Sequence, residues 1–136
     1  MQIDGACHCG HLSYEAELDP EQVGVCHCTD CQTLSGSAFS IFAQVPKSAF
    51  RMRTGQPRIY VKVAESGNRR AQAFCADCGT RIYASADHDP QFFNLRVGTI
   101  RQRAELPPKV QIWCRSALPW VPDLRSVRQL PTQSQT

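Results

Sequence analysis

The chain has 136 residues, which suits one domain with a substantial hydrophobic core and is short for two. Its hydrophobic content of 42% is ordinary for a globular protein, and no apolar run approaches the length of a membrane span. Residues 1–4 lack the basic and apolar regions of a secretory signal, so we expect a cytoplasmic protein without membrane association. The formal net charge of +3 comes from arginines scattered along the chain, a pattern that does not indicate nucleic-acid binding.

The chain contains eight cysteines. In a reducing compartment, cysteines in tight CxC and CxxC pairs favour metal binding over a disulfide framework. A zinc ion bound by four thiolates carries two net negative charges, and one bound by three carries a single negative charge. Two such sites would therefore cancel the formal charge of +3.

Short segments in which apolar and polar residues alternate predict β-strands. In chain order they cover residues 13–18, 38–45, 58–63, 71–74, 92–97 and 110–114, with proline-, glycine- and aspartate-rich breakers between them. Only residues 29–34 suggest a helix, of one or two turns, ended by Gly36. The pattern predicts an all-β domain of antiparallel sheets, either a sandwich or an open barrel, over residues 1–125, and a flexible tail at 126–136.

Two cysteine pairs at distant points of the chain have the spacing of a closed metal site. Cys7 and Cys9 form a CxC pair, Cys75 and Cys78 form a CxxC pair, and a glycine follows each pair. A tight turn can place both sulfurs of such a pair about 2.3 Å from a shared zinc, and the glycine lets backbone N–H groups approach the sulfurs. We predict a structural zinc site that ties the N-terminal segment to the middle of the chain and contributes folding free energy.

A third group places Cys26, Cys28 and Cys31 within six residues. One short segment can wrap three sulfurs around a metal, but no neighbouring residue completes the tetrahedron. Three protein ligands with an open position is the pattern of a catalytic zinc. We predict a second, open zinc site here, from which the metal can be lost on isolation because exposed thiolates are easily stripped or oxidised.

Other residues with ligand chemistry have more than one interpretation. Cys114 could supply a fourth ligand to the second site, but its position in a predicted strand favours a buried cysteine beside Trp113. His8 and His27 each lie between paired cysteines. We expect both histidines to face solvent or to contact the ligands without binding the metal.

The segment around the second site allows further functions. Cys28 and Cys31 could form a thioredoxin-type redox pair, although the βαβ pattern of that fold is missing. His27 and Asp30 are candidates for a general base. Residues 33–37 either line a pocket with N–H and hydroxyl donors or form the turn that ends the helix.

These motifs resemble the glutathione-dependent formaldehyde-activating enzyme family, which shares its domain with centromere protein V. The resemblance covers nearly the whole chain, and the order of the three cysteine groups is its most specific part. The matching residues are Gly5-x-Cys7-x-Cys9-Gly10, Cys26-His27-Cys28-x-x-Cys31, Gly36-Ser37-x-Phe39, Gly55, Tyr60, Phe74-Cys75-x-x-Cys78-Gly79-Thr80, Val97-Gly98-Thr99 and Trp120.

The resemblance implies an Mss4-like fold, a zinc-bearing assembly of antiparallel sheets. It also implies a division of the ligands: Cys7, Cys9, Cys75 and Cys78 for the structural zinc, and Cys26, Cys28 and Cys31 for the catalytic zinc. The family's named reaction joins glutathione and formaldehyde into S-(hydroxymethyl)glutathione. We therefore expect a zinc-dependent carbon–sulfur lyase that acts on a small thiol and a small carbonyl compound, with the metal holding the thiol as a thiolate. The rival hypothesis is a non-enzymatic zinc-binding interaction or chaperone-like module of the same fold.

Overall fold

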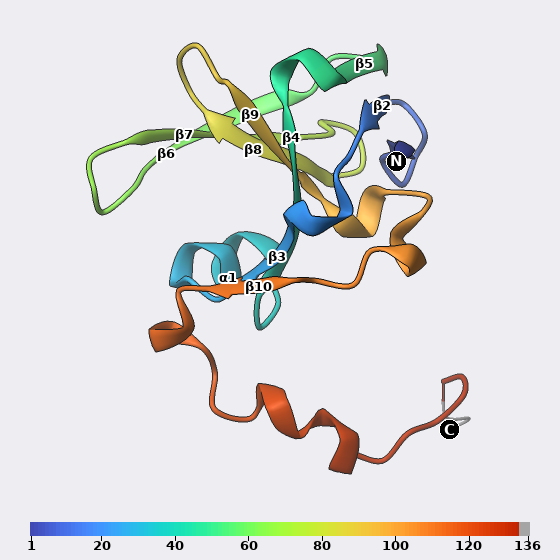
Figure 1. Cartoon of the computed structure of the whole chain (residues 1–136), viewed down its shortest axis with the longest axis vertical. Helices are drawn as coiled ribbons and strands as arrows, with labels where there is room; N and C mark the ends of the chain where they lie inside the picture. Colours follow the sequence, from blue (N-terminus) through green and yellow to red (C-terminus); the bar gives the residue numbers. More distant parts are fainter. Residues whose placement is uncertain (134–136) are drawn as a thin grey trace.

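The computed structural model describes residues 1–133 and contains two β-sheets (Figure 1). The smaller sheet is antiparallel, with three strands in the order β1-β2-β5: β1 (Gln2–Ala6), β2 (Ser13–Glu17) and β5 (Phe50–Thr54). The larger sheet has seven strands in the order β10-β3-β4-β9-β8-β7-β6. These are β3 (Val23–Cys26), β4 (Ser40–Pro46), β6 (Arg58–Val63), β7 (Arg69–Phe74), β8 (Arg81–Ala86), β9 (Phe92–Arg96) and β10 (Val110–Ile112).

Short helical segments connect the strands. The described residues contain one α-helix, α1 (Thr29–Ser35). Its first residue follows Cys28, whose Sγ accepts a hydrogen bond from the Cys31 N–H, and Gly36 ends it at φ 62°. The 3₁₀-helices are η1 (Pro20–Gln22), η2 (Lys47–Ala49), η3 (Val97–Thr99), η4 (Arg103–Glu105), η5 (Cys114–Ser116) and η6 (Val121–Ser126).

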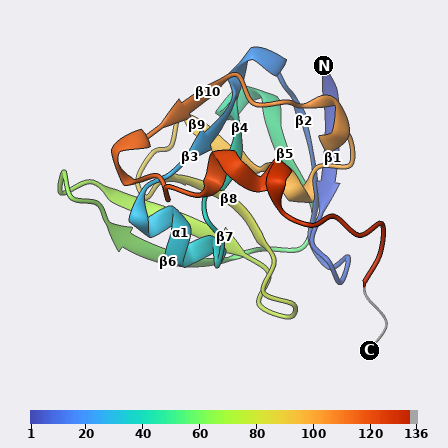
Figure 2. The same cartoon turned by 90° about the horizontal axis from the view of Figure 1, so that it is seen from below.

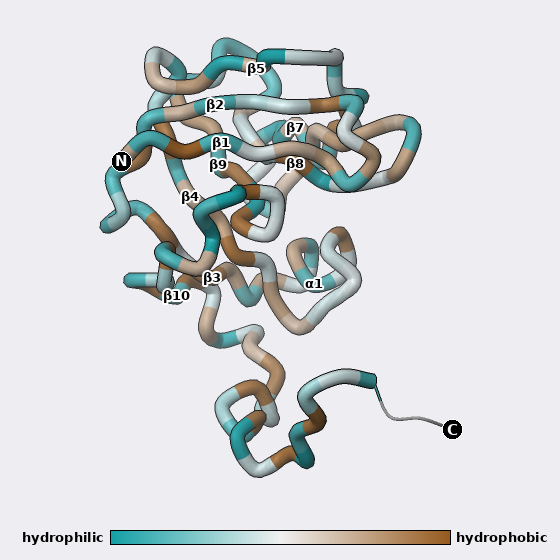
Figure 3. The backbone as a smooth tube through the Cα atoms, turned by 90° about the vertical axis from the view of Figure 1, so that its right-hand side faces the viewer, coloured by the Kyte–Doolittle hydropathy of each residue, from teal (hydrophilic) through white to brown (hydrophobic). Residues whose placement is uncertain are grey.

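The hydrophobic core receives buried side chains from both sheets. Members from the small sheet and its loops are Ile3, Leu12, Tyr14 and Ala16, and members from the large sheet are Val23, Ala43, Val45, Ile82 and Leu95. Phe50 of β5 packs its ring against those of Tyr83 and Phe93, with ring centroids 5.6 and 4.8 Å apart. Each fully buried large apolar side chain stabilises a fold by about 1.5–3 kcal/mol, so this packing holds the sheets together. Figure 3 shows hydrophobic stretches in β1, β4 and β9.

The register of the large sheet separates two faces. Ala43 of β4 lies opposite Leu95 of β9, which lies opposite Tyr83 of β8, and these side chains belong to the core or pack against it. Residues one position away point to the other face. This second face carries polar residues from four adjacent strands, and it positions the candidate site described below.

The predicted all-β architecture with one short helix is confirmed, with corrections to its details. β1, β3, β5 and β8 were not predicted, and β3 has no alternating pattern because it is buried at every position. The sheets are not entirely antiparallel, since β10 pairs with β3 in parallel register. β10 also ends at Ile112, short of the predicted 110–114.

The segment after η5 runs away from the sheets to one end of the molecule (Figure 1), and seen from that end it lies in front of them (Figure 2). It contains η6 and the exposed side chains of Trp120, Leu124, Val127 and Leu130. The predicted domain limit at residue 125 and the flexibility of 126–136 stay predictions, and residues 134–136 lie outside the described part of the chain. No helix within residues 1–133 has the length and apolar character needed to cross a membrane.

Candidate metal centres and the adjoining pocket

The structure gathers the seven predicted ligand cysteines into two sets. The four-thiol cluster consists of Cys7, Cys9, Cys75 and Cys78, and the three-thiol cluster consists of Cys26, Cys28 and Cys31. Within each cluster all Sγ atoms lie within 4.8 Å of one another. Cys114 belongs to neither.

Two tight turns build the four-thiol cluster. Cys7 and Cys9 lie on the turn after β1, while Cys75 and Cys78 lie between β7 and β8. The Sγ atom of Cys9 is 3.6 Å from that of Cys7 and 3.7 Å from that of Cys75. A zinc ion with bonds of about 2.3 Å in tetrahedral geometry requires sulfurs roughly 3.8 Å apart, so these residues fit a zinc ion.

Hydrogen bonds hold these sulfurs in place. The backbone N–H of Leu12 donates to Cys7 Sγ at 3.2 Å, and the Thr80 hydroxyl lies 3.2 Å from Cys78 Sγ. The Thr80 hydroxyl lowers the pKa of Cys78 to about 5, because it stabilises the thiolate. Gly79 adopts φ 79°, a left-handed conformation that favours glycine, and its N–H donates to the Cys75 carbonyl at 2.8 Å.

The three-thiol cluster lies where β3 passes into α1. Cys26 ends β3, Cys28 precedes the first residue of α1, and Cys31 lies in the first turn of the helix. The pKa of Cys31 is lowered to about 5, mainly by a hydrogen bond from Cys26, whose own pKa is raised by the same bond. Among the described residues, no fourth Cys, His, Asp or Glu joins this group of candidate ligands.

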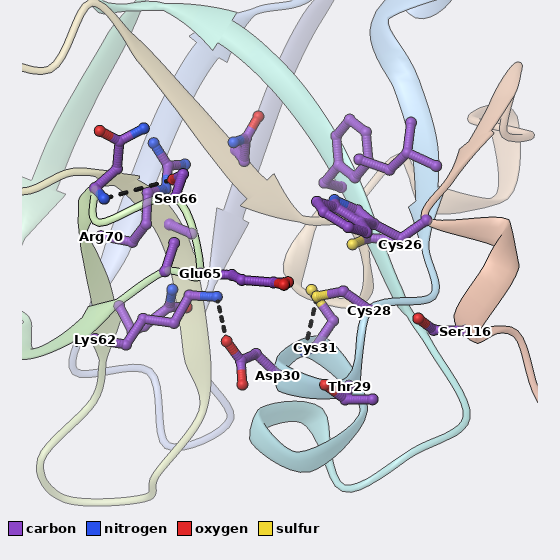
Figure 4. A pocket seen from close by; sticks show the side chains of 18 of the residues that line it. Cys26, Cys28, Thr29, Asp30, Cys31, Lys62, Glu65, Ser66, Arg70 and Ser116 are labelled. Carbon is purple, nitrogen blue, oxygen red and sulfur yellow. Dashed lines mark hydrogen bonds and ion pairs between the residues drawn. The ribbon is translucent and has the colours of Figure 1, made fainter.

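A pocket of about 380 Å³ opens beside the three-thiol cluster (Figure 4). Its lining comes from α1, the β6–β7 hairpin, the segment after β10 and the second face of the large sheet. The lining residues are Cys26, Cys28, Thr29, Asp30, Cys31, Phe42, Gln44, Lys62, Ala64, Glu65, Ser66, Asn68, Arg70, Gln72, Ala84, Asn94, Arg96, Ile112, Trp113, Arg115 and Ser116.

Ion pairs connect the walls of this pocket. Lys62 Nζ of the hairpin lies 2.8 Å from Asp30 Oδ2 of α1. On another side, Arg115 Nη2 lies 3.9 Å from Glu65 Oε2, and the Arg115 guanidinium lies 5.0 Å from the centre of the Trp113 ring. Trp113 adopts φ 57°, an unusual conformation for a bulky residue and one that is often found near functional sites.

The sequence analysis did not identify the polar floor of the pocket. Gln72, Ala84, Asn94 and Gln44 form one row across β7, β8, β9 and β4, and Gln44 Nε2 donates to Asn94 Oδ1 at 3.2 Å. Their alternation with core residues showed only that they face away from the core. The pocket arises because α1 and the segment after β10 lie beside this face, an arrangement for which the sequence held no local signal.

Arg70 and Arg96 add two positive charges to the pocket lining. Neither forms an ion pair with Asp or Glu anywhere in residues 1–133. Burial lowers the pKa of Arg96, and the negative charges of the three-thiol cluster, Cys31 first, act in the opposite direction. The Arg96 guanidinium therefore lies close to the cluster.

Two expectations change in the structure. Of the two alternatives for His27, solvent exposure is wrong: its side chain is 2% exposed, and its Nε2 lies 2.7 Å from Gln111 Oε1. This burial beneath β10 makes it a poor candidate for a general base, whereas Asp30 does line the pocket. Cys114 is not a buried strand residue, because β10 ends at Ile112 and Cys114 lies exposed in η5.

Residues 33–37 form the end of α1 rather than part of the pocket lining. Thr33 and Ser35 belong to the last turn of the helix, and the Gly36 N–H donates to the Thr33 carbonyl at 3.2 Å. Residues 33–37 are therefore the turn that ends the helix, as the second of the two interpretations held.

The fold and the two thiol clusters define a β-sheet protein with two candidate metal centres, one closed and one next to a pocket. The chain belongs to the glutathione-dependent formaldehyde-activating enzyme family, since its residues 2–116 match the model of that family. A relative in Penicillium rubens, named "Putative glutathione-dependent formaldehyde-activating enzyme", is 30% identical over 91 residues, which cover 65% of this chain and 47% of the relative. The chain thus spans about half the length of this curated relative.

A solved structure supports the fold. The crystal structure of a Rhodobacter sphaeroides protein superimposes with a TM-score of 0.61 at 20% sequence identity, covering 79% of this chain and 98% of that one. At this identity the likeness shows the fold alone, and it confirms the predicted β architecture.

Proposed function

We propose that this chain is a zinc-dependent carbon–sulfur lyase that forms an adduct between a thiol and a small carbonyl compound, with glutathione and formaldehyde as its substrates. Family membership and the name of the Penicillium relative support this activity. The observation that carries the proposal is the three-thiol cluster, which lines a pocket without a fourth candidate ligand among the described residues.

Two zinc ions fit the seven sulfurs. The four-thiol cluster would hold a structural ion, because its Sγ distances of 3.6 and 3.7 Å match tetrahedral coordination and Cys7 and Cys75 are buried. Cys26, Cys28 and Cys31 would hold the second. Zinc bound there lowers the pKa of an incoming thiol, so that a nucleophilic thiolate is available at neutral pH.

The pocket residues would bind the substrates and move one proton. The reaction forms one S–C bond, and the proton lost by the thiol ends on the former carbonyl oxygen. Asp30 is held by Lys62 at 2.8 Å, whereas Glu65 lies 3.9 Å from Arg115, has a side chain that is 86% exposed, and extends across the pocket toward Cys28 (Figure 4). We assign to the Glu65 carboxylate the transfer of this proton, with His27 excluded by its burial.

The test measures adduct formation directly. The zinc-loaded protein is mixed with glutathione and formaldehyde, and the rate of S-(hydroxymethyl)glutathione formation is followed by NMR exchange spectroscopy against the uncatalysed rate. Cys28→Ser should abolish the acceleration, while Cys114→Ser, which removes an exposed cysteine outside both clusters, should retain it. A wild-type rate equal to the uncatalysed rate would contradict the proposal.

A specific observation also favours the alternative, a non-enzymatic zinc-binding interaction module. The edge strand β6 exposes Ile59, Tyr60 and Val63, an apolar surface of the kind that binds partner proteins. Metal content separates the two hypotheses: the enzyme needs two zinc ions per chain, whereas the module needs only the ion of the four-thiol cluster.

A further inference from the structure

We propose that Arg96 and Arg70 form a carboxylate receptor on the floor of the pocket, so that the site selects a substrate with a carboxylate close to its reacting atom. This inference rests on the proposed function and names the substrate class of the same site. It concerns two residues whose chemistry the adduct-forming reaction itself does not require, because formaldehyde is uncharged.

The first argument is the hydrogen-bonding state of Arg96. The residue lines the pocket, and its buried Nε has no hydrogen-bond partner among residues 1–133. A buried guanidinium nitrogen without an acceptor is costly, and native proteins rarely leave one without a purpose. A carboxylate is the acceptor that matches its planar geometry and its charge.

The second argument is the distribution of charge. Four cations line the pocket, and two of them, Lys62 and Arg115, are paired with Asp30 and Glu65. Arg70 and Arg96 have no Asp or Glu partner in the described part of the chain, and their two charges exceed the single negative charge of a zinc ion with three thiolates, which leaves a local excess of positive charge. The position of Arg96 near the three-thiol cluster brings this charge close to the reacting atoms.

The third argument is the arrangement of the floor around these arginines. Arg96 lies on the same strand and the same face as Asn94, and Arg70 lies likewise beside Gln72. Gln44 donates to Asn94, and Arg81 donates to Gln72, so both amides are held in place by neighbours. A fixed polar surface with two unpaired guanidinium groups is suited to bind an anion in one orientation.

The carboxylate could belong to either substrate. Glutathione carries carboxylates in the same molecule as its thiol. A 2-oxo acid such as glyoxylate carries one next to its carbonyl carbon. The pocket geometry supports binding of a carboxylate, and the experiment distinguishes a carboxylate of the thiol from one of the carbonyl compound.

The test first measures binding without turnover. Isothermal titration calorimetry of the zinc-loaded protein compares 3-mercaptopropionate with the uncharged 3-mercaptopropanol, which differ in the carboxylate alone. Arg96→Gln should weaken the binding of 3-mercaptopropionate by about 10- to 100-fold, as expected for loss of a charge-assisted hydrogen bond, and leave the binding of 3-mercaptopropanol unchanged. Arg96→Lys should restore part of the affinity, and Arg58→Gln, an exposed residue of β6 outside the pocket, should have no effect.

An equal loss of affinity for both thiol compounds would overturn the proposal, since it would show that Arg96 only balances the charge of the three-thiol cluster. Unchanged binding of 3-mercaptopropionate by a folded Arg96→Gln variant would overturn it as well. Because this readout needs no catalysis, it remains decisive even if no adduct is formed, so the two proposals fail separately.

Steady-state kinetics then identifies the source of the carboxylate. If Arg96→Gln raises the KM for glyoxylate above the wild-type value and leaves the KM for formaldehyde unchanged, the receptor belongs to the carbonyl substrate. A higher KM for glutathione with both carbonyl compounds would assign it to the thiol. Unchanged KM values for all three substrates would overturn the role of Arg96 in substrate selection.

Discussion

Loss of one ligand of the four-thiol cluster should have a much larger effect on stability than loss of one from the three-thiol cluster. Cys75 is 0% exposed, and its Sγ lies 3.7 Å from that of Cys9, which is 66 positions away in the chain. A cross-link over a loop of this length restricts the unfolded chain by about 4 kcal/mol in the chain-entropy model. Structural zinc binding itself contributes roughly 10–16 kcal/mol, comparable to the whole stability of a small domain, about 5–15 kcal/mol. Cys75→Ser should therefore unfold the domain.

Cys28→Ser provides the comparison. The three-thiol cluster joins residues within one short segment. For so short a loop, the same chain-entropy model predicts a stabilisation of only about 2 kcal/mol. For a chain of this length, that energy corresponds to a decrease in melting temperature of about 10 °C or less. The variant should stay folded and lose one zinc ion.

Differential scanning calorimetry of zinc-loaded protein measures both effects, with zinc content determined on the same samples. Cys114→Ser is the matched control, because it makes the same replacement at an exposed cysteine outside both clusters. Its melting temperature should equal that of the wild type. Equal melting temperatures for Cys75→Ser and Cys28→Ser would refute the division into a structural and an open site.

Three further measurements follow from the site and the core. A mild chelator should remove one of two zinc ions quickly, together with activity and with little loss of ellipticity; simultaneous loss of both ions would contradict an exposed second site. Glu65→Gln should lower kcat by about 100-fold or more without changing zinc content, since the proton would lose its carrier, and a rate near that of the wild type would exclude this role. Burial raises the pKa of Tyr14 to about 12, and its hydroxyl lies 2.7 Å from Thr99 Oγ1. Because the unfolded phenol titrates near pH 10, the neutral phenol stabilises the fold below about pH 10, and this contribution of about 3 kcal/mol is lost as the pH rises through 12. Alkaline denaturation of Tyr14→Phe should lack this component, and identical pH profiles for the two proteins would contradict the assignment.

The cysteine groups were predictable because ligand spacing is a local property of the chain. A CxC or CxxC pair brings two sulfurs together through a single turn, and the sequence alone indicated which pairs belong to one cluster. Alternating residues likewise predicted six strands, and Gly36 predicted the end of α1. Among the strands that were missed, β3 is buried at every position and so contains no polar residues to mark a face.

The amino-acid sequence by itself determined the grouping of the cysteines and the β-sheet class of this protein. Only the tertiary structure decided which polar residues line the pocket beside the three-thiol cluster. Arg96 and Arg70 read as ordinary surface arginines, and their place in a pocket depends on strand register and on the segments that lie beside the sheet. The burial of His27 depends on β10, which pairs with β3 from the far end of the chain. Contacts between residues so distant in sequence leave no local pattern, since side-chain alternation records which face a residue occupies and not what covers that face.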